Sequence, residues 1–238
     1  MLLPLINITL MIKSKHIFLL ILFYNTISYG QTAFVTYKLQ STNPSESERV
    51  LKVKKEVELM EFTLSYNQNS SFFHKEKNVP VDRYIANIAS ILSGAGNDFY
   101  QYSKNKTVLQ NQQITGKMYQ VDYSRKFNGW QLTNETKQIN QYTCYKAILP
   151  EFNEHTQSTT ETIAWFTLEI PAPYGPIGYG GLPGLILELT YKYAVYSVKS
   201  ITLNPKKGVD FPKIKEGKVI TENEWVVLMR KARKVTDD

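Results

Sequence analysis

The sequence predicts a mostly β protein, with an α+β composition as the alternative, built on a curved antiparallel sheet or half-barrel with a few short helices. Three observations lead to this fold class. Aromatic residues make up 13% of the chain, with 16 Tyr and 11 Phe, and aromatic side chains favour strands. Runs of alternating apolar and polar residues recur between turn residues, whereas few segments show helical spacing. Hydrophobic residues at 42% and charged residues at 21% are enough for a buried core.

The first 30 residues resemble an export signal rather than part of the fold. Lys13 and Lys15 precede an apolar run over residues 17–24, and the small residues up to Gly30 suit cleavage by a signal peptidase. The run is shorter than the roughly 20 residues that a transmembrane helix needs. We therefore expect a signal peptide over residues 1–30, with an uncleaved signal anchor as the alternative.

The mature chain is expected to start at Gln31 and to form a single β-rich domain over residues 31–238, because it contains no linker, repeat or low-complexity tract. Cys144 is the only cysteine, which excludes an intrachain disulfide and a lipid anchor on the first mature residue. The expected location is periplasmic or extracellular, in soluble form, with no transmembrane segment after signal cleavage.

Eight strands are expected from the alternation of side chains. In the first of them, Ala33, Val35 and Tyr37 share one face. A later strand is apolar on both faces at its start, at Leu185 and Ile186, which indicates that both sides are covered there. The expected strands cover residues 33–39, 61–66, 98–102, 118–123, 139–149, 162–170, 185–191 and 194–203.

Two helices are expected between and after these strands. The first covers residues 80–92 and ends at Gly94, a residue type that commonly terminates helices. Its expected buried side carries Val81, Ile85, Ile88 and Leu92. The second covers residues 222–234 and follows a capping-box pattern that begins at Thr221. Residues 46–58 fit either a helix or an exposed strand.

One segment, residues 171–184, differs from the rest of the chain in composition. Nine of its 14 residues are Gly or Pro, so we expect a loop of defined shape rather than a flexible one. It contains neither the G-x-x-x-x-G-K-[ST] pattern of a phosphate loop nor the G-x-S-x-G pattern of a nucleophile elbow. The interpretations that remain are a structural crossover between two strands and part of a binding surface.

The same loop carries a resemblance to a known family. The preceding residues 164–171 resemble the pattern A-W-[FY]-T-x-x-I-P, residues 142–147 resemble Y-x-C-x-K-A, and Gln141 stands where Gly often precedes that Tyr. The signature of the GLPGLI family of secreted proteins from Gram-negative bacteria is spelled by Gly181, Leu182, Pro183, Gly184, Leu185 and Ile186. The resemblance implies a secreted, mostly β protein of unknown function. The curved sheet also resembles half-barrel carriers of the lipoprotein-localisation type.

The residues that could perform chemistry are few. His74 and His155 are both expected in solvated loops, with no nucleophile and carboxylate arranged beside them. Cys144 is expected to be a buried, small apolar residue. Glu169 and Glu188 flank the Gly- and Pro-rich loop and could act as a pair of carboxylates, or each could lie on a solvated face. We predict no catalytic residue, no metal site and no cofactor.

Aromatic residues on successive strands suggest a surface for an apolar, peptide or glycan ligand, although they describe an aromatic core equally well. The residues predicted to contact a ligand or partner are Trp165 and Tyr179, with Pro183, Gly184 and Leu185 shaping the surface. The leading hypothesis is a non-enzymatic exported protein that binds such a ligand or a cell-envelope protein. The alternatives are a carboxylate-dependent periplasmic hydrolase and a structural subunit of an outer-membrane assembly.

The formal net charge of +7 does not indicate a nucleic-acid binder. Loss of residues 1–30 leaves +5, and residues 199–234 alone carry +6, so the excess is a feature of the C-terminal part. This basic part is expected either to face an anionic envelope surface or to be a solvated helix. Expected export makes nucleic acid an unsuitable partner.

Overall fold

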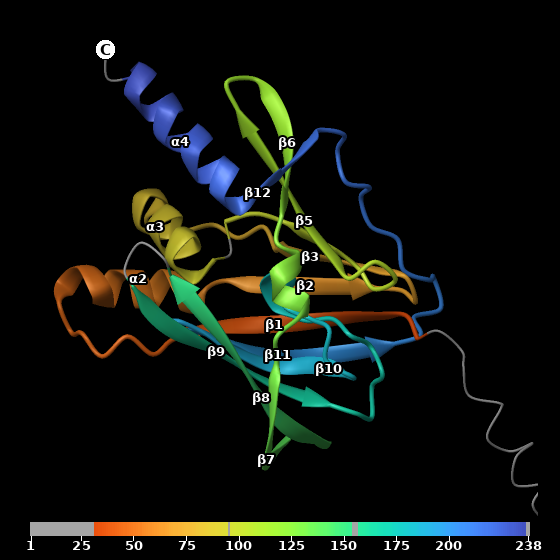
Figure 1. The fold of residues 1–238 in the computed structure, drawn as a ribbon. Helices are drawn as coiled ribbons and strands as arrows, with labels where there is room; N and C mark the ends of the chain where they lie inside the picture. Colours follow the sequence, from red (N-terminus) through yellow and green to blue (C-terminus); the bar gives the residue numbers. More distant parts are fainter. Residues whose placement is uncertain (1–30, 95, 154–156, 237–238) are drawn as a thin grey trace, which may run out of the picture. The chain divides into compact units, whose positions relative to one another are not determined.

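Twelve strands join into one sheet in the computed structural model, which describes residues 31–94, 96–153 and 157–236 (Figure 1). The expected signal peptide over residues 1–30 lies outside the described residues. The strands are β1 (Ala33–Ser41), β2 (Glu61–Tyr66), β3 (Ser70–Lys75), β4 (Phe99–Tyr102), β5 (Thr107–Ile114), β6 (Lys117–Asp122), β7 (Gln131–Ile139), β8 (Tyr142–Asn153), β9 (Ser158–Thr167), β10 (Leu185–Tyr191), β11 (Ala194–Leu203) and β12 (Lys218–Thr221).

The first strand, β1, lies in the middle of the sheet, between β2 and β11. From edge to edge the order is β12-β6-β5-β4-β3-β2-β1-β11-β10-β9-β8-β7. Neighbouring strands are antiparallel except for β12 and β6, which are parallel. The prediction of a mostly β protein with a curved sheet is confirmed, and the sheet is mixed at one edge rather than wholly antiparallel.

One face of the sheet forms the core, and β1 shows how the sequence produces it. Its alternate residues Ala33, Val35, Tyr37 and Leu39 are all buried, because successive side chains of a strand point to opposite faces. Rings from β1, β2, β3 and β11 then pack together with centroids 5.2 to 6.2 Å apart. These rings belong to Tyr37, Phe62, Phe73 and Tyr196.

Three helices and two single 3₁₀ turns accompany the sheet among the described residues. Residues 46–58, which fitted two interpretations, contain a helix. The expected capping box is present, because the Thr221 N–H donates to Oε2 of Glu224 at 2.7 Å and the Glu224 N–H donates to Oγ1 of Thr221 at 3.2 Å. The elements are α2 (Glu48–Glu58), α3 (Arg83–Ser93), α4 (Glu222–Thr236), η1 (Ser124–Phe127) and η2 (Pro176–Gly178).

Several strand boundaries differ from the expectation. The strand expected over residues 139–149 is instead the end of β7, a tight turn and most of β8. Asn140 takes the turn conformation with a φ of +53°, which Asn tolerates better than most residues, so the bend does not need Gly at position 141. Strands β3, β5, β12 and all but the last residue of β7 were not expected. β3 carries an unbroken buried run and β5 is rich in glutamine, so neither shows clear alternation.

Helix α3 buries only part of the side expected to face the core. Asp82 caps its N-terminus and Gly94 ends it with a φ of +77°, so the helix and its stop are as expected, although it starts at Arg83. Of the expected buried residues, Ile85 is buried and Ile88 packs partly buried against the core, whereas Val81 and Leu92 are exposed. The buried side is turned toward the small residues Ala86, Ala89, Ser90 and Ser93. No helix among the described residues has the length and apolar character to cross a membrane.

Candidate functional site

The Gly- and Pro-rich loop over residues 171–184 packs against the core rather than forming an open surface. Tyr174, Ile177, Tyr179 and Leu182 are each at most 2% exposed. The glycines allow this close packing. A Cβ at Gly181, which has a φ of +81°, would lie 2.0 Å from the carbonyl oxygen of Phe127. The loop therefore acts as a structural crossover, in agreement with the simpler of the two interpretations.

Side chains from distant strands fix the loop backbone. Gln101 on β4 donates from Nε2 to the carbonyl oxygen of Tyr179 at 3.0 Å. Trp130 donates from its indole N–H to the carbonyl oxygen of Gly180 at 2.8 Å. Tyr37 on β1 donates from its hydroxyl to the carbonyl oxygen of Ile186 at 2.7 Å, just beyond the loop. Each bond satisfies a buried polar group on both sides, which makes the closed loop the stable arrangement.

A buried lysine also contacts the loop. Lys126 in η1 is 6% exposed and donates from Nζ to the carbonyl oxygen of Ile177 at 2.8 Å. The same Nζ lies 4.3 Å, 4.9 Å and 4.8 Å from the ring centroids of Phe99, Tyr123 and Tyr179. Burial lowers the pKa of Lys126 to about 7, and the nearby charge of Arg125 lowers it further. No sequence pattern indicates this arrangement, since a lysine between Arg and Phe in a turn is usually exposed.

Beside this lysine, a network of polar side chains surrounds Glu151 on β8. Oε2 of Glu151 accepts hydrogen bonds from the hydroxyls of Thr162 at 2.7 Å and Tyr179 at 2.9 Å. Arg125 pairs with Glu151 and with Glu222 at the start of α4. Burial raises the pKa of Glu151, but the hydrogen bond from Thr162 and the charge of Arg125 outweigh burial and hold it below its usual value. The network joins the loop, β8 and α4.

The structure divides the predicted contact residues into two groups. Tyr179, Gly184 and Leu185 are buried, so an external ligand reaches them only if the loop opens. Pro183 is exposed and Trp165 is partly buried, so both are accessible. In the signature, Gly181 and Pro183 face outward, whereas its buried members are Leu182, Gly184, Leu185 and Ile186.

The two predicted carboxylates each have a structural partner. Glu188 pairs with Nζ of Lys137 at 2.6 Å, and the same Nζ lies 4.4 Å from the ring centroid of Trp165. Glu169 accepts a hydrogen bond from the N–H of Thr143 at 2.9 Å. These contacts explain both residues without any chemical role. Neither contact supports a carboxylate-dependent hydrolase.

The remaining candidates occupy ordinary structural positions. His74 lies on β3 and is half-buried, stacked on Phe72 with ring centroids 4.9 Å apart, so the expectation of a solvated loop is wrong. His155 lies outside the described residues. Cys144 is buried, as expected. Within the described part of the chain, no three His, Cys, Asp or Glu side chains are placed to hold a metal ion.

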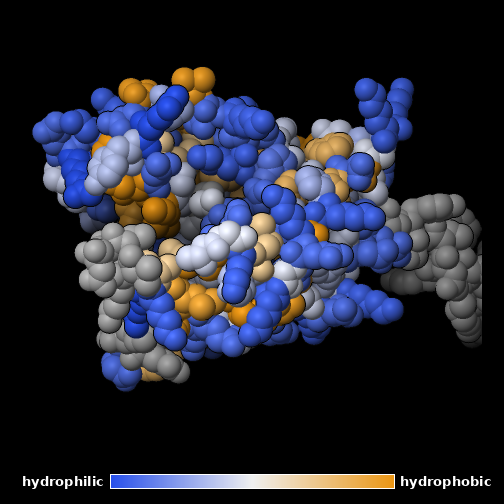
Figure 2. Space-filling model, turned by 90° about the horizontal axis from the view of Figure 1, so that it is seen from above, coloured by the Kyte–Doolittle hydropathy of each residue, from blue (hydrophilic) through white to orange (hydrophobic). Residues whose placement is uncertain are grey.

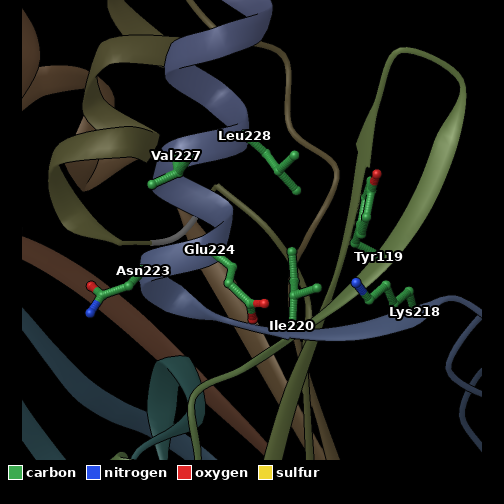
Figure 3. A pocket seen from close by; sticks show the side chains of 7 residues that line it. All are labelled: Tyr119, Lys218, Ile220, Asn223, Glu224, Val227 and Leu228. Atoms are coloured by element: carbon green, nitrogen blue, oxygen red, sulfur yellow. The ribbon is translucent and has the colours of Figure 1, made fainter.

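Two surface hollows lie beside the helices. The first, of about 420 Å³, separates α4 from β6 and β12, and Leu228 points across it toward Tyr119 (Figure 3). The second, of about 490 Å³, lies at the segment leading into α3, where it is bordered by Lys75, Lys77 and Arg83. Both hollows are remote in sequence from the predicted contact residues.

Helix α3 and the segment before it expose a group of large apolar side chains, which we call the α3 apolar patch. The members and their exposed fractions are Val79 91%, Val81 85%, Tyr84 68%, Ile91 75% and Leu92 60%. Apolar side chains are visible among hydrophilic ones at the left end of Figure 2, the end where α2 and α3 lie in Figure 1. Sequence spacing did not reveal this patch, because it places Val81 and Leu92 on the same side as Ile85 and Ile88, which do pack on the core. The composition of α3 alone does not show which of its apolar residues are buried.

The comparisons with known proteins agree with this description. A family model described as "Protein of unknown function (Porph_ging)" matches residues 149–188, from β8 through the loop into β10. No curated protein matches the chain. Among solved structures, that of PNGF-II in space group P21 is similar, with a TM-score of 0.54 and 15% identity over 85% of this chain. The chain spans only 34% of the PNGF-II chain, and the likeness shows the fold alone.

Proposed function

We propose that the chain is an exported, non-enzymatic protein of the GLPGLI type that binds a component of the cell envelope through the α3 apolar patch. The observation that carries this proposal is the orientation of α3. Five large apolar side chains of α3 and the segment before it are exposed, while the helix buries Ile85 together with Ala and Ser residues. An exposed apolar group of this size on a folded domain commonly marks an interaction site.

Binding at the surface is favoured over binding inside the curved sheet. The loop over residues 171–184 fills the space against the core face, and its own large side chains are buried. The aromatic residues that suggested a ligand surface are in part core residues, as Tyr100 shows. The export signal, the family signature and the envelope location remain part of the proposal. They rest on the sequence.

The test is cosedimentation of purified mature chain, residues 31–238, with washed bacterial cell envelopes. The double variant I91D/L92D places two charges in the patch and should lower the bound fraction about tenfold or more. Leu132→Asp is the matched control, because Leu132 on β7 is 63% exposed and lies away from α3. The function is refuted if the wild type does not bind, or if both variants bind as the wild type does.

A further inference from the structure

We infer that the α3 apolar patch docks on the anionic surface of a lipid bilayer. This inference rests on the proposed function and names its partner class. It requires an apolar stripe that inserts between headgroups and cations at its border that contact anionic lipid.

The stripe follows helical geometry. Tyr84, Ile91 and Leu92 are spaced i, i+7 and i+8 and are all exposed, so they lie along one side of α3. The opposite side packs inward with Ile85 and the small residues Ala86, Ala89 and Ser90. A helix that buried its larger side would hide this stripe. The chain instead displays it.

The segment before α3 extends the stripe and is held in place. Val79 and Val81 are the most exposed large apolar residues of the described chain. Glu56 of α2, which is 2% exposed, accepts a hydrogen bond from the N–H of Asp82 at 2.6 Å. Asp82 in turn accepts from the N–H groups of Tyr84 and Ile85 at 2.8 and 3.1 Å. The two valines are thus presented next to the helix by a fixed backbone.

The charges around the stripe favour an anionic partner. Lys77 and Arg83 form no ion pair among the residues that the structure describes. Three cations, Lys75, Lys77 and Arg83, line the hollow beside the patch with one carboxylate, Glu76, which accepts a hydrogen bond from Thr63 at 2.5 Å. The nearby Asp82 keeps its charge while it caps α3. The cations therefore outnumber the carboxylates at this border.

A bilayer suits this surface better than a second copy of the chain. A second copy of the chain would bring the same cations, Lys77 and Arg83, to the interface, so a dimer would gather like charges there. Anionic headgroups instead meet both cations, while Tyr84 has the ring and hydroxyl that suit the membrane interface. A protein partner is the outcome that the experiment must separate.

The first experiment places an environment-sensitive fluorophore on Leu92→Cys. The native Cys144 does not compete for the label, because it is buried and burial raises its pKa to about 11. Vesicles that contain phosphatidylglycerol should shift the emission of the label to the blue. Pure phosphatidylcholine vesicles should shift it less. The same label on Leu132→Cys should not respond to either. No blue shift at position 92 with any vesicle overturns the inference.

The second experiment measures vesicle cosedimentation of unlabelled chain. The vesicle affinity of I91D/L92D should be lower than that of the wild type by about tenfold or more. The vesicle affinity of K77E/R83E should also fall about tenfold, and its residual binding should depend less on salt concentration than that of the wild type. K104E/K106E reverses two exposed charges in the β4–β5 turn and should bind as the wild type does. Equal losses for both charge variants would mean nonspecific attraction and would refute the assignment to α3.

The two proposals fail in different ways. If the wild type binds vesicles and I91D/L92D does not, the result supports both the proposed function and the lipid inference. Envelope binding that depends on the patch, without any binding to protein-free vesicles, refutes the lipid inference and leaves the proposed function with a protein partner. Absence of binding to both envelopes and vesicles refutes both. Circular dichroism and thermal unfolding of each variant exclude misfolding as the cause.

Discussion

Replacement of Lys126 by Met tests how the core holds the loop. Lys126 has a pKa of about 7 in the folded chain, set first by burial, against an ordinary value of 10.5. Between these values the unfolded chain carries the proton and the folded chain does not. The free energy of unfolding therefore rises with pH in this window, because the unfolded state binds more protons. Lys126→Met removes this dependence while it keeps an unbranched side chain of similar length.

The magnitude follows from the width of the window. One pH unit corresponds to about 1.4 kcal/mol, so the wild type should gain about 3 kcal/mol relative to Lys126→Met between pH 7 and pH 9.5. Below about pH 6 both states are protonated and the difference should be constant. All other ionisable groups are shared by the two proteins, so their contributions largely cancel in the difference.

The assay is urea unfolding of both proteins at a series of pH values from 5.5 to 9.5, followed by fluorescence and circular dichroism. Lys117→Met, which removes an exposed lysine on β6, is the control for loss of a positive charge. A difference that stays constant across the whole range would refute the reasoning. It would mean that the rings of Phe99, Tyr123 and Tyr179 hold the ammonium in its charged form.

Three further changes test the loop and its surroundings. Gly184→Ala should destabilise the fold by about 3 kcal/mol or prevent folding, because its Cβ would lie 1.8 Å from the carbonyl oxygen of Thr167. The control is Gly96→Ala, which has open space around it and should leave the melting temperature unchanged. Glu151→Gln should lower the free energy of unfolding by about 1–3 kcal/mol at pH 7 and by progressively less as pH falls below 4.5. The reason is that the lowered pKa of Glu151 stabilises the folded chain only while the carboxylate is ionised. A loss of the same size at pH 3 would contradict this. Trp165→Ala should leave the capture of envelope components within about twofold of the wild type, because Trp165 lies on β9, outside the α3 apolar patch. A severalfold loss with the fold retained would move part of the binding surface to Trp165.

The position of the Gly- and Pro-rich loop gives a physical account of the unusual sequence over residues 171–184. A Cβ would collide with backbone at Gly180, Gly181 and Gly184 and with buried side chains at Gly175 and Gly178, and the apolar residues of the loop fill the core. Such a segment is constrained by packing on nearly every residue. A recognisable sequence at this point therefore does not require a catalytic or ligand-binding role.

The features that the sequence determined by itself are those set by neighbours along the chain. The alternation in β1, the Gly94 stop of α3 and the Thr221–Glu224 capping box all depend on residues a few positions apart. The burial of Leu185 at the start of β10 was predictable for the same reason, because two adjacent apolar residues leave no polar face.

Only the tertiary structure decided which surfaces are left open. The side of α3 that faces the core depends on elements brought beside it by long-range contacts, and both of its sides contain residues suited to burial. Lys126 is buried only because the loop, some 50 residues later, closes over it. The parallel pairing of β12 with β6 joins segments about 100 residues apart. No local pattern encodes such contacts, since their free energy comes from surfaces that meet only after the chain has folded.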